Sequence, residues 1–292
     1  MTLADHTTWP AETGAAPRRR VDARLLFGSG VLAVIVITAL AAGQIAPHDP
    51  MEQDLLDQLL PPSWAVGGDP AHLLGTDDLG RDLLSRLIYG ARPAVLVMLL
   101  GASLSGLLGV SLGVAAGYFG GWVDIVVSRA VEIFMAFPPM LLTIVLVAVV
   151  NPGLSAVVIA ITVVGWTRFC RVVRGEMLVL REQAFVTSAH AIASTHRRIL
   201  LHEILPNLVP LLTVLFGLEM GRAIVVEAVL SFMGFSASGM ATWGGIIADG
   251  RASIYQAWWV MADPIALIVI AVLGLNAFGD GLRRLIDPVL RS

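Results

Sequence analysis

The 292-residue chain contains no lysine, so all 19 of its basic side chains are arginines. A phosphate-binding loop of the form G-x-x-x-x-G-K-[ST] is therefore impossible, and the H-E-x-x-H motif is also missing. These absences exclude the common nucleotide-binding loop and a zinc protease helix. We expect a protein that is not an enzyme and that holds no cofactor.

Cysteine, histidine and charge are scarce as well. The one cysteine, Cys170, excludes a disulfide framework and a cysteine-based metal site. The six histidines all fall outside the long apolar runs, so we expect no histidine metal site within the membrane and assign no residue to a metal. Charged residues make up 14% of the chain, against about 25% in soluble domains, and 57% are hydrophobic. This composition predicts a membrane protein.

Six apolar windows are each long enough to cross a bilayer, which takes about 20 residues. They lie at 25–46, 94–118, 125–150, 154–173, 208–234 and 262–282. Continuous runs of this length predict helices, because a membrane barrel shows short alternating segments instead. A long polar arm precedes the first window, which favours a retained span over a cleaved signal peptide. The predicted fold class is an all-α polytopic membrane protein with six transmembrane helices.

Arginines gather in three segments, and this distribution predicts the orientation of the chain. They precede the first window, lie between the fourth and fifth, and follow the sixth. Since positively charged segments stay in the cytoplasm, we expect a cytoplasmic arm at 1–24, a cytoplasmic loop at 174–207 and a cytoplasmic tail at 283–292. Segments 47–93 and 235–261 then face the extracytoplasmic side.

The two outer segments have patterns of their own. The stretch HLLGTDDLGRDLLSRLIYGAR, residues 72–92, alternates leucines with charged residues at helical spacing. It predicts an amphipathic helix that lies at the outer interface before the second span. Residues 230–251 are too rich in glycine to span the membrane and predict a packed outer loop or a re-entrant turn.

Three ionisable residues fall inside the fifth window, where charge is costly and therefore points to function. Arg222 lies near the middle, with Glu219 three residues before it and Glu227 five after it. Glu219 and Arg222 share a helix face, whereas Glu227 points elsewhere. Two interpretations stay open: Glu219 neutralises Arg222 as part of packing, or Arg222 lines a water-filled path and contacts an anionic group of a solute. We take all three as candidates for a solute path.

The inner loop is polar although apolar spans lie on both sides of it. Its sequence predicts two short helices that meet near Ser194 and Thr195, where a hydroxyl caps the second helix. Pro206 is expected to break the helix before it. A short helix below the membrane, attached to a span on each side, is suited to act as a lever.

Four motifs, in order along the chain, carry a resemblance to a known family. They are LGTDDLGRDLLSRLIYGAR before the second span, RVVRGEMLVLREQAFVTSAHAIASTHRRILLHEILPN in the inner loop, LSFMGF after the fifth span and NAFGDGLRRLIDP at the end. From about residue 22 onward the chain resembles the permease subunits of bacterial binding-protein-dependent ABC importers of the dipeptide, oligopeptide and nickel branch. Within that branch it is similar to the second permease of the pair.

The resemblance implies a fold and a set of partners. The fold is that of a type I importer permease, with six spans and a coupling helix in the cytoplasmic loop. The partners are a homologous second permease, two ABC ATPase subunits that hydrolyse ATP, and an extracytoplasmic solute-binding protein; no nucleic acid is implied. The loop residues that it assigns to ATPase contact are Phe185, Val186, Ser188, Ala189, Ala193, Ser194, Arg197, Leu205, Pro206 and Asn207.

The coupling loop departs from the family pattern at three positions, Thr187, Ser188 and Ala193. Thr187 stands where relatives carry an acidic residue, which removes one charge contact with an ATPase. Ala193 stands where relatives carry glycine. If the turn requires a positive φ, Ala193 destabilises it by about 0.5–1 kcal/mol or changes its bend.

The family resemblance leaves the transported solute open. Small peptides are the leading prediction, with nickel or a metal-chelator complex as the alternative. A secondary transporter driven by an ion gradient is a remote alternative, since it would show an internal repeat and broken spans at the membrane midplane. A structural membrane scaffold is a third class, and it predicts that replacing residues 185–200 leaves uptake intact.

Overall fold

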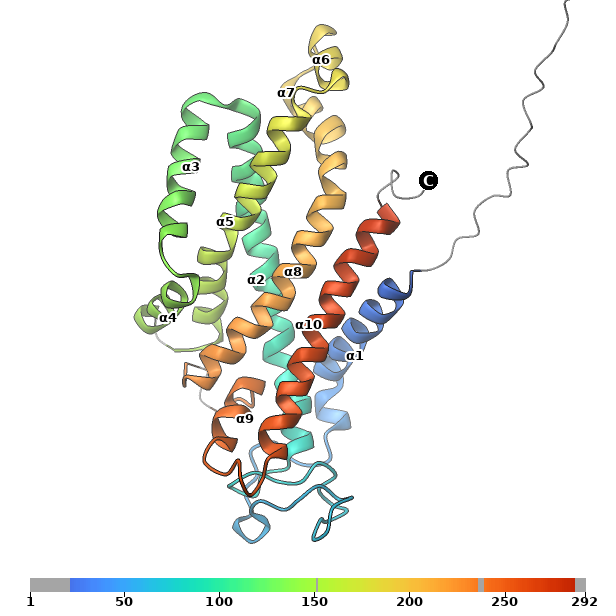
Figure 1. Ribbon diagram of the computed structural model, residues 1–292, viewed down its shortest axis with the longest axis vertical. Helices are drawn as coiled ribbons and strands as arrows, with labels where there is room; N and C mark the ends of the chain where they lie inside the picture. The colour runs from blue at the N-terminus through green and yellow to red at the C-terminus, as the bar shows by residue number, and fades with distance from the viewer. Residues whose placement is uncertain (1–21, 151, 236–238, 287–292) are drawn as a thin grey trace, which may run out of the picture.

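A computed structural model of the chain describes residues 22–150, 152–235 and 239–286 (Figure 1). Most of the predicted N-terminal arm and part of the predicted C-terminal tail lie outside these ranges. Within them the regular structure is helical, and no strand is present. This agrees with the all-α class predicted from the apolar windows.

Five helices are long and apolar enough to cross a membrane. Each overlaps one of the predicted windows, although most extend beyond its limits. They are α1 (Ala23–Ile45), α2 (Leu83–Phe119), α5 (Leu154–Leu180), α8 (Leu205–Phe232) and α10 (Trp259–Ile286). In Figure 1 they run along the long axis of the molecule as one bundle.

The prediction of one continuous helix over 125–150 is wrong. The structure has two helices there, α3 (Gly121–Ala136) and α4 (Pro139–Val150), which are bent by 90° relative to each other. Phe137 between them has an extended backbone, with φ −90° and ψ 141°. It precedes Pro138, and proline disfavours helical geometry in the residue before it. Counted as one broken span, this pair raises the number of candidate spans to six.

The prediction of a separate interfacial helix before the second span is also wrong. Residues 83–92 form the first turns of α2, which continues without a break to Phe119. The Asp82 side chain caps this helix by accepting from the Ser85 amide at 2.8 Å. Ser85 and Arg86, which the amphipathic pattern places in water, are both buried. They are buried because they bond to other parts of the chain, which a sequence pattern does not show.

A network of charged side chains joins the start of α2 to α9 (Trp243–Gly250), and in it Asp78 lies 3.9 Å from Arg81. Arg81 Nε lies 2.7 Å from Asp77 Oδ2, and Arg81 Nη2 lies 2.8 Å from Asp249 Oδ2. Arg86 pairs with the same two carboxylates and contacts Asp249 at 2.8 Å. Asp77, Arg81 and Arg86 are buried. Burial and the charges of Asp77 and Asp249 raise the pKa of the neighbouring Asp78.

Glycines allow α2 and α5 to pack backbone against backbone. A methyl group at Gly109, Gly113 or Gly117 of α2 would lie 2.3–2.7 Å from atoms of Trp166, Cys170 or Met177 of α5. The four-residue spacing of these glycines places them on one helix face. Larger side chains at these positions would push the two helices apart.

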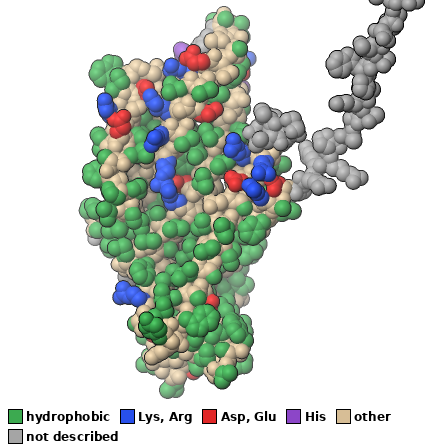
Figure 2. All heavy atoms as spheres, viewed as in Figure 1, with side chains coloured by type: hydrophobic (Ala, Val, Ile, Leu, Met, Phe, Trp, Pro, Cys, Tyr) green, Lys and Arg blue, Asp and Glu red, His purple; other side chains and the backbone are tan. Residues whose placement is uncertain are grey.

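The two ends of the bundle differ in structure. At one end lie α6 (Ala184–Ala191), α7 (His196–Arg198) and a π-helical turn (Ile199–Ile204); we call this the α6 end. At the other lie α9 and a 3-10 turn (Leu55–Asp57); we call this the α9 end. Figure 2 shows charged side chains gathered toward the α6 end, while hydrophobic side chains cover the middle of the visible face. An apolar middle is what a lipid bilayer requires.

Candidate functional site

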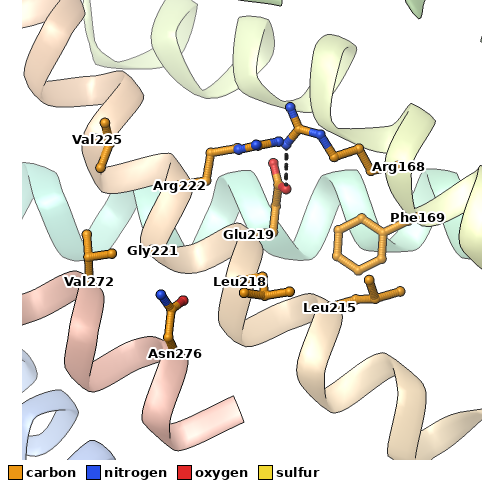
Figure 3. Close-up of a pocket in the computed structure, with 10 residues that line it drawn as sticks. All are labelled: Arg168, Phe169, Leu215, Leu218, Glu219, Gly221, Arg222, Val225, Val272 and Asn276. Carbon is orange, nitrogen blue, oxygen red and sulfur yellow. Dashed lines mark hydrogen bonds and ion pairs between the residues drawn. The ribbon is translucent and has the colours of Figure 1, made fainter. Parts of the chain in front are cut away.

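Charged residues from two helices meet in a cavity of about 390 Å³ that α5, α8 and α10 line (Figure 3). Arg168 comes from α5, whereas Glu219 and Arg222 come from α8. Asn276 of α10 adds a neutral polar group, and the rest of the lining is mainly apolar. The cavity therefore has an apolar wall with a few convergent polar groups, which is the usual form of a small-molecule site.

Glu219 pairs with Arg168 and not with Arg222. Arg168 Nη1 lies 3.2 Å from Glu219 Oε2, and this contact joins α5 to α8. Glu219 is 6% exposed, whereas Arg222 is an exposed side chain. Among the residues that the structure describes, Arg222 has no ion-pair partner. The pairing of Glu219 with Arg222 that the first interpretation requires is therefore not found, while a solute path lined by Arg222 stays a prediction.

The charge balance of the cavity is positive. Figure 3 shows the Arg168 and Arg222 side chains reaching toward one another over the single carboxylate of Glu219. Two guanidinium groups and one carboxylate leave one positive charge without an internal counter-ion. Arginine presents a planar set of donors that matches a carboxylate. The arrangement is suited to bind an anionic group.

Glu227, the third candidate from the sequence, lies away from this cavity. It is 2% exposed, and its carboxylate accepts a hydrogen bond from the Ser231 hydroxyl at 2.6 Å. It is not among the lining residues. Its position five residues after Arg222 turns it to another helix face. Arg168, by contrast, lines the cavity, and its partner Glu219 could not be identified from the sequence because it is 51 residues away.

The coupling loop predicted from the resemblance forms a short helix with one buried face. Val186 and Ala189 are buried, whereas Phe185, Ser188 and Arg197 are exposed. The buried side chains pack with Val173 and Met177 of α5, with Ile199 and Ile204 of the π-helical turn and with Leu208 of α8. The loop is therefore fixed to two spans, while its other face is free.

The turn after α6 adopts the conformation that favours glycine. Ala193 has φ of 56°, which is in the left-handed region. The Ser194 amide donates to the Ala189 carbonyl at 3.1 Å across this turn. Thr195 then caps α7 by accepting from the Arg198 amide at 3.4 Å. The turn therefore has the positive φ on which the expected destabilisation at Ala193 depends. The predicted hydroxyl cap is confirmed at Thr195.

Pro206 does not break the helix as the sequence suggested. Leu205 and Pro206 open α8, and the π-helical turn leads into it without a gap. Proline is tolerated in the first turn of a helix, where its missing amide proton has no partner to lose. Asn207 follows and donates from Nδ2 to the Glu203 carbonyl at 2.6 Å. Helical structure therefore connects α7 directly to the fifth span.

Comparison with known proteins places this geometry in a family. Residues 109–292 match the model of the binding-protein-dependent transport system inner membrane component, and residues 24–62 match the N-terminal TM domain of oligopeptide transport permease C. A dipeptide transport system permease of Haemophilus influenzae is 38% identical over 268 residues, which is 91% of each chain. A di/tripeptide transport system permease of Pseudomonas aeruginosa is also 38% identical, over 91% of this chain and 88% of that one.

A solved structure shares the fold. An inward-facing conformation of the MetNI methionine ABC transporter matches with a TM-score of 0.59 at 19% sequence identity, covering 70% of this chain and 98% of that one. This likeness concerns the arrangement of helices alone. The chain therefore belongs to the family of binding-protein-dependent transport system inner membrane components, and it is a multi-pass inner-membrane permease of a bacterial ABC importer.

Proposed function

We propose that the chain forms half of the path by which an importer takes small peptides into the cell. The other half is a homologous permease, an extracytoplasmic binding protein delivers the peptide, and two ATPase subunits supply the energy. Two relatives are named as permeases of dipeptide and di/tripeptide transport systems, and these names support small peptides as the cargo. The alternating opening of the path to the two sides of the membrane is the transport step.

We place the α6 end in the cytoplasm and the α9 end outside. The arginines that surround the inner loop, including Arg181, Arg197 and Arg198, lie at or near the α6 end. Segments rich in arginine stay on the cytoplasmic side. In this orientation the exposed face of α6 meets the ATPases.

The observation that carries the peptide assignment is the unpaired positive charge in the cavity. Arg222 is available to bind the carboxylate at the end of a peptide, because it has no ion-pair partner among the described residues, while Arg168 is paired with Glu219. A bare nickel ion fits this cavity poorly, because two guanidinium groups repel a cation. The apolar lining is indifferent to side-chain identity, as a carrier of varied peptides requires.

We propose that α6 transmits the work of the ATPases. Its exposed residues Phe185 and Ser188, with Arg197 beyond the turn, form the contact face, whereas the buried Val186 and Ala189 fix the helix to α5 and α8. Leu205, Pro206 and Asn207 begin α8, so a displacement of α6 reaches the span that carries Arg222. The turn at Ala193 is connected to that span by the cap of α7 and by continuous helical structure.

Uptake of labelled dipeptide into proteoliposomes tests the cargo site. The chain is reconstituted with its partner subunits, and Arg222→Ala is compared with Arg251→Ala, an exposed arginine near the α9 end. A hydrogen bond to a charged group contributes about 1.5–3 kcal/mol, so we expect Arg222→Ala to lower uptake about tenfold or more. The loss should be much smaller for a dipeptide whose C-terminus is amidated. An equal loss for both peptides would contradict carboxylate recognition.

Two further measurements test the partners. Phe185→Ala is expected to lower peptide-stimulated ATP hydrolysis of the assembled complex, while membrane insertion and thermal stability stay unchanged. Unchanged stimulation would remove α6 from the coupling contact. Peptide uptake by vesicles that contain no ATPase subunits would overturn the proposed energy source and favour an ion-gradient transporter.

A further inference from the structure

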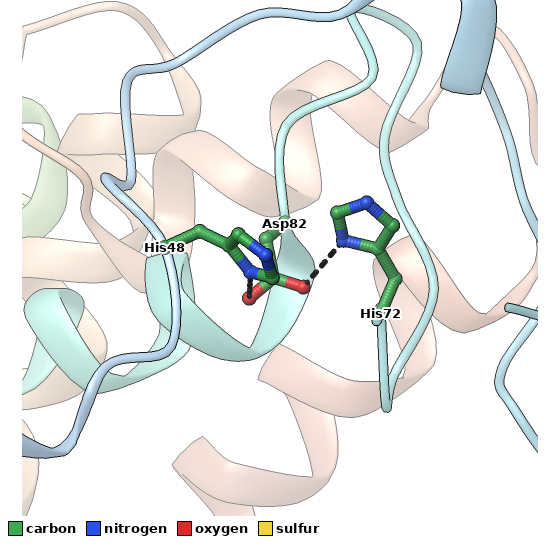
Figure 4. Close-up of side chains that lie close together, drawn as sticks. All are labelled: His48, His72 and Asp82. Carbon is green, nitrogen blue, oxygen red and sulfur yellow. Dashed lines mark hydrogen bonds and ion pairs between the residues drawn. The ribbon is translucent and has the colours of Figure 1, made fainter. Parts of the chain in front are cut away.

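Three side chains from separate segments converge at the α9 end, outside the spans (Figure 4). His48 follows α1, His72 lies in the long connection to the second span, and Asp82 caps α2. One ligand atom from each lies within 4.8 Å of the others. Two imidazoles and a carboxylate form a ligand set typical of zinc and related transition metal ions.

The distances within the cluster suit a tetrahedral site. His72 Nδ1 lies 2.9 Å from Asp82 Oδ1, and His48 Nδ1 lies 3.8 Å from Asp82 Oδ2. Ligands of a tetrahedral zinc ion with bonds of about 2.0–2.1 Å are separated by about 3.3 Å, which falls between these two values. The two distances run to different oxygens of Asp82, and one ligand atom of each residue lies within 4.8 Å of the others.

His48 presents a nitrogen that needs a partner. Its Nδ1 is buried, and within the described ranges it has no hydrogen-bond partner, although it faces Asp82. Buried polar atoms are normally bonded, so such an atom calls for an explanation. The position of His48 is fixed by its own amide, which donates to the Ser85 hydroxyl at 3.0 Å. A metal ion between His48 and Asp82 would satisfy this nitrogen.

His72 is already oriented as a metal ligand. Its Nδ1 faces Asp82, and its Nε2 lies 3.8 Å from Asp57 Oδ2 on the opposite side of the ring. Metal-binding histidines commonly direct their second nitrogen to a carboxylate, which fixes the ring and strengthens the ligand. Asp57 is placed to be this supporting group.

The surroundings of the cluster attract cations. The cluster lines a cavity of about 140 Å³ together with four more carboxylates, those of Asp49, Glu52, Asp54 and Asp57. No arginine is among the residues that line it. Each of these carboxylates raises the local concentration of a divalent cation. The charge of this cavity is opposite to that of the cavity lined by Arg168 and Arg222, which has an excess of positive charge.

We propose that His48, His72 and Asp82 bind one divalent transition metal ion, with zinc as the best match and water as the fourth ligand. The ion fastens the segment after α1 and the connection at His72 to the first turn of α2. The role is to cross-link the chain, since the three ligands come from three separate segments.

Cobalt titration of the full chain in lipid nanodiscs tests this site. Co²⁺ is the probe because its absorption reports tetrahedral coordination, and the chain carries an affinity tag without histidine. We expect one Co²⁺ per chain, with tetrahedral bands that Zn²⁺ abolishes by displacement. His48→Gln and His72→Gln are expected to remove the bands, whereas His202→Gln, at the α6 end, should leave them unchanged.

Two milder variants keep the test independent of folding. Asp57→Asn is expected to weaken binding about 10- to 100-fold without removing it. Asp82→Asn keeps the helix cap, because asparagine caps as well as aspartate, but it should weaken binding strongly. Bands that persist in both histidine variants, or Co²⁺ binding without tetrahedral bands, would overturn the proposal. None of these measurements involves transport, so their failure would leave the proposed function intact.

Discussion

The charged networks at the α9 end and in the cavity differ in how their arginines are neutralised. At the α9 end Arg81 and Arg86 share two carboxylates, Asp78 lies 3.9 Å from Arg81, and every member has partners. In the cavity two arginines face one carboxylate. Arginines whose charges are neutralised hold a structure together, whereas an arginine without a counter-ion is available to a ligand. We infer that the first network fixes the fold, and we propose the cavity as the place that meets the solute.

The largest loss of stability is expected when one carboxylate of the Arg81 and Arg86 network at the α9 end is neutralised. Asp77→Asn leaves Arg86 with Asp249 alone and Arg81 with Asp249 and the more distant Asp78, and removing one partner of a buried ion pair typically costs about 3–5 kcal/mol. Denaturant unfolding in detergent measures this loss. The control is Asp69→Asn, an exposed residue of the same segment, which should change the stability by less than about 0.5 kcal/mol. Equal effects of the two variants would show that the network contributes no stability.

The cavity predicts an intermediate effect that separates its two arginines. Arg168→Ala strands the buried Glu219 without its partner and should lower the free energy of unfolding by about 1–3 kcal/mol. Arg222→Ala removes a side chain that has no ion-pair partner among the described residues, so stability should stay within about 0.5 kcal/mol. Both variants should impair peptide uptake. Equal loss of stability in the two variants would refute the difference between paired and available charge.

The smallest effect on stability is expected at the α6 end, where the feature tested is a strained backbone conformation and not a charged network. Ala193→Gly should raise the free energy of unfolding by about 0.5–1 kcal/mol, because glycine removes the steric cost of the left-handed conformation but adds entropy to the unfolded chain. Ala191→Gly, at the end of α6, lacks this compensation and should lower it. Thermal unfolding of both variants in one detergent gives the sign of each change. A destabilised Ala193→Gly protein would show that the turn is not strained.

The sequence predicted the spans well because apolar runs of this length have few other solutions. It failed at Phe137, where two prolines interrupt an apolar run whose hydropathy does not change. It also failed at Arg86, since a charged residue on an amphipathic pattern looks solvent-exposed until its partner Asp249 is placed beside it. In both places the hydropathy pattern of the segment does not show the backbone break or the ion pair that decides the local structure.

The candidate sites were predicted less completely, because their members are distant in sequence. Glu219 and Arg222 were found from their place in an apolar window, but the true partner of Glu219 comes from another helix. The cluster of His48, His72 and Asp82 unites three segments, and no spacing rule connects them. The left-handed turn at Ala193 was anticipated, since the family pattern carries glycine there.

The uninterrupted course of α2 has a mechanical consequence. Its 37 residues extend about 55 Å, from the cap at Asp82 to Tyr118, whose hydroxyl lies 2.8 Å from His196 Nδ1 in α7. One helix therefore connects the α9 end, where we propose that the binding protein docks, with the α6 end, where we propose that the ATPases bind. A tilt imposed at either end arrives at the other as a displacement of the same helix, so communication across the membrane needs no chain of side-chain rearrangements.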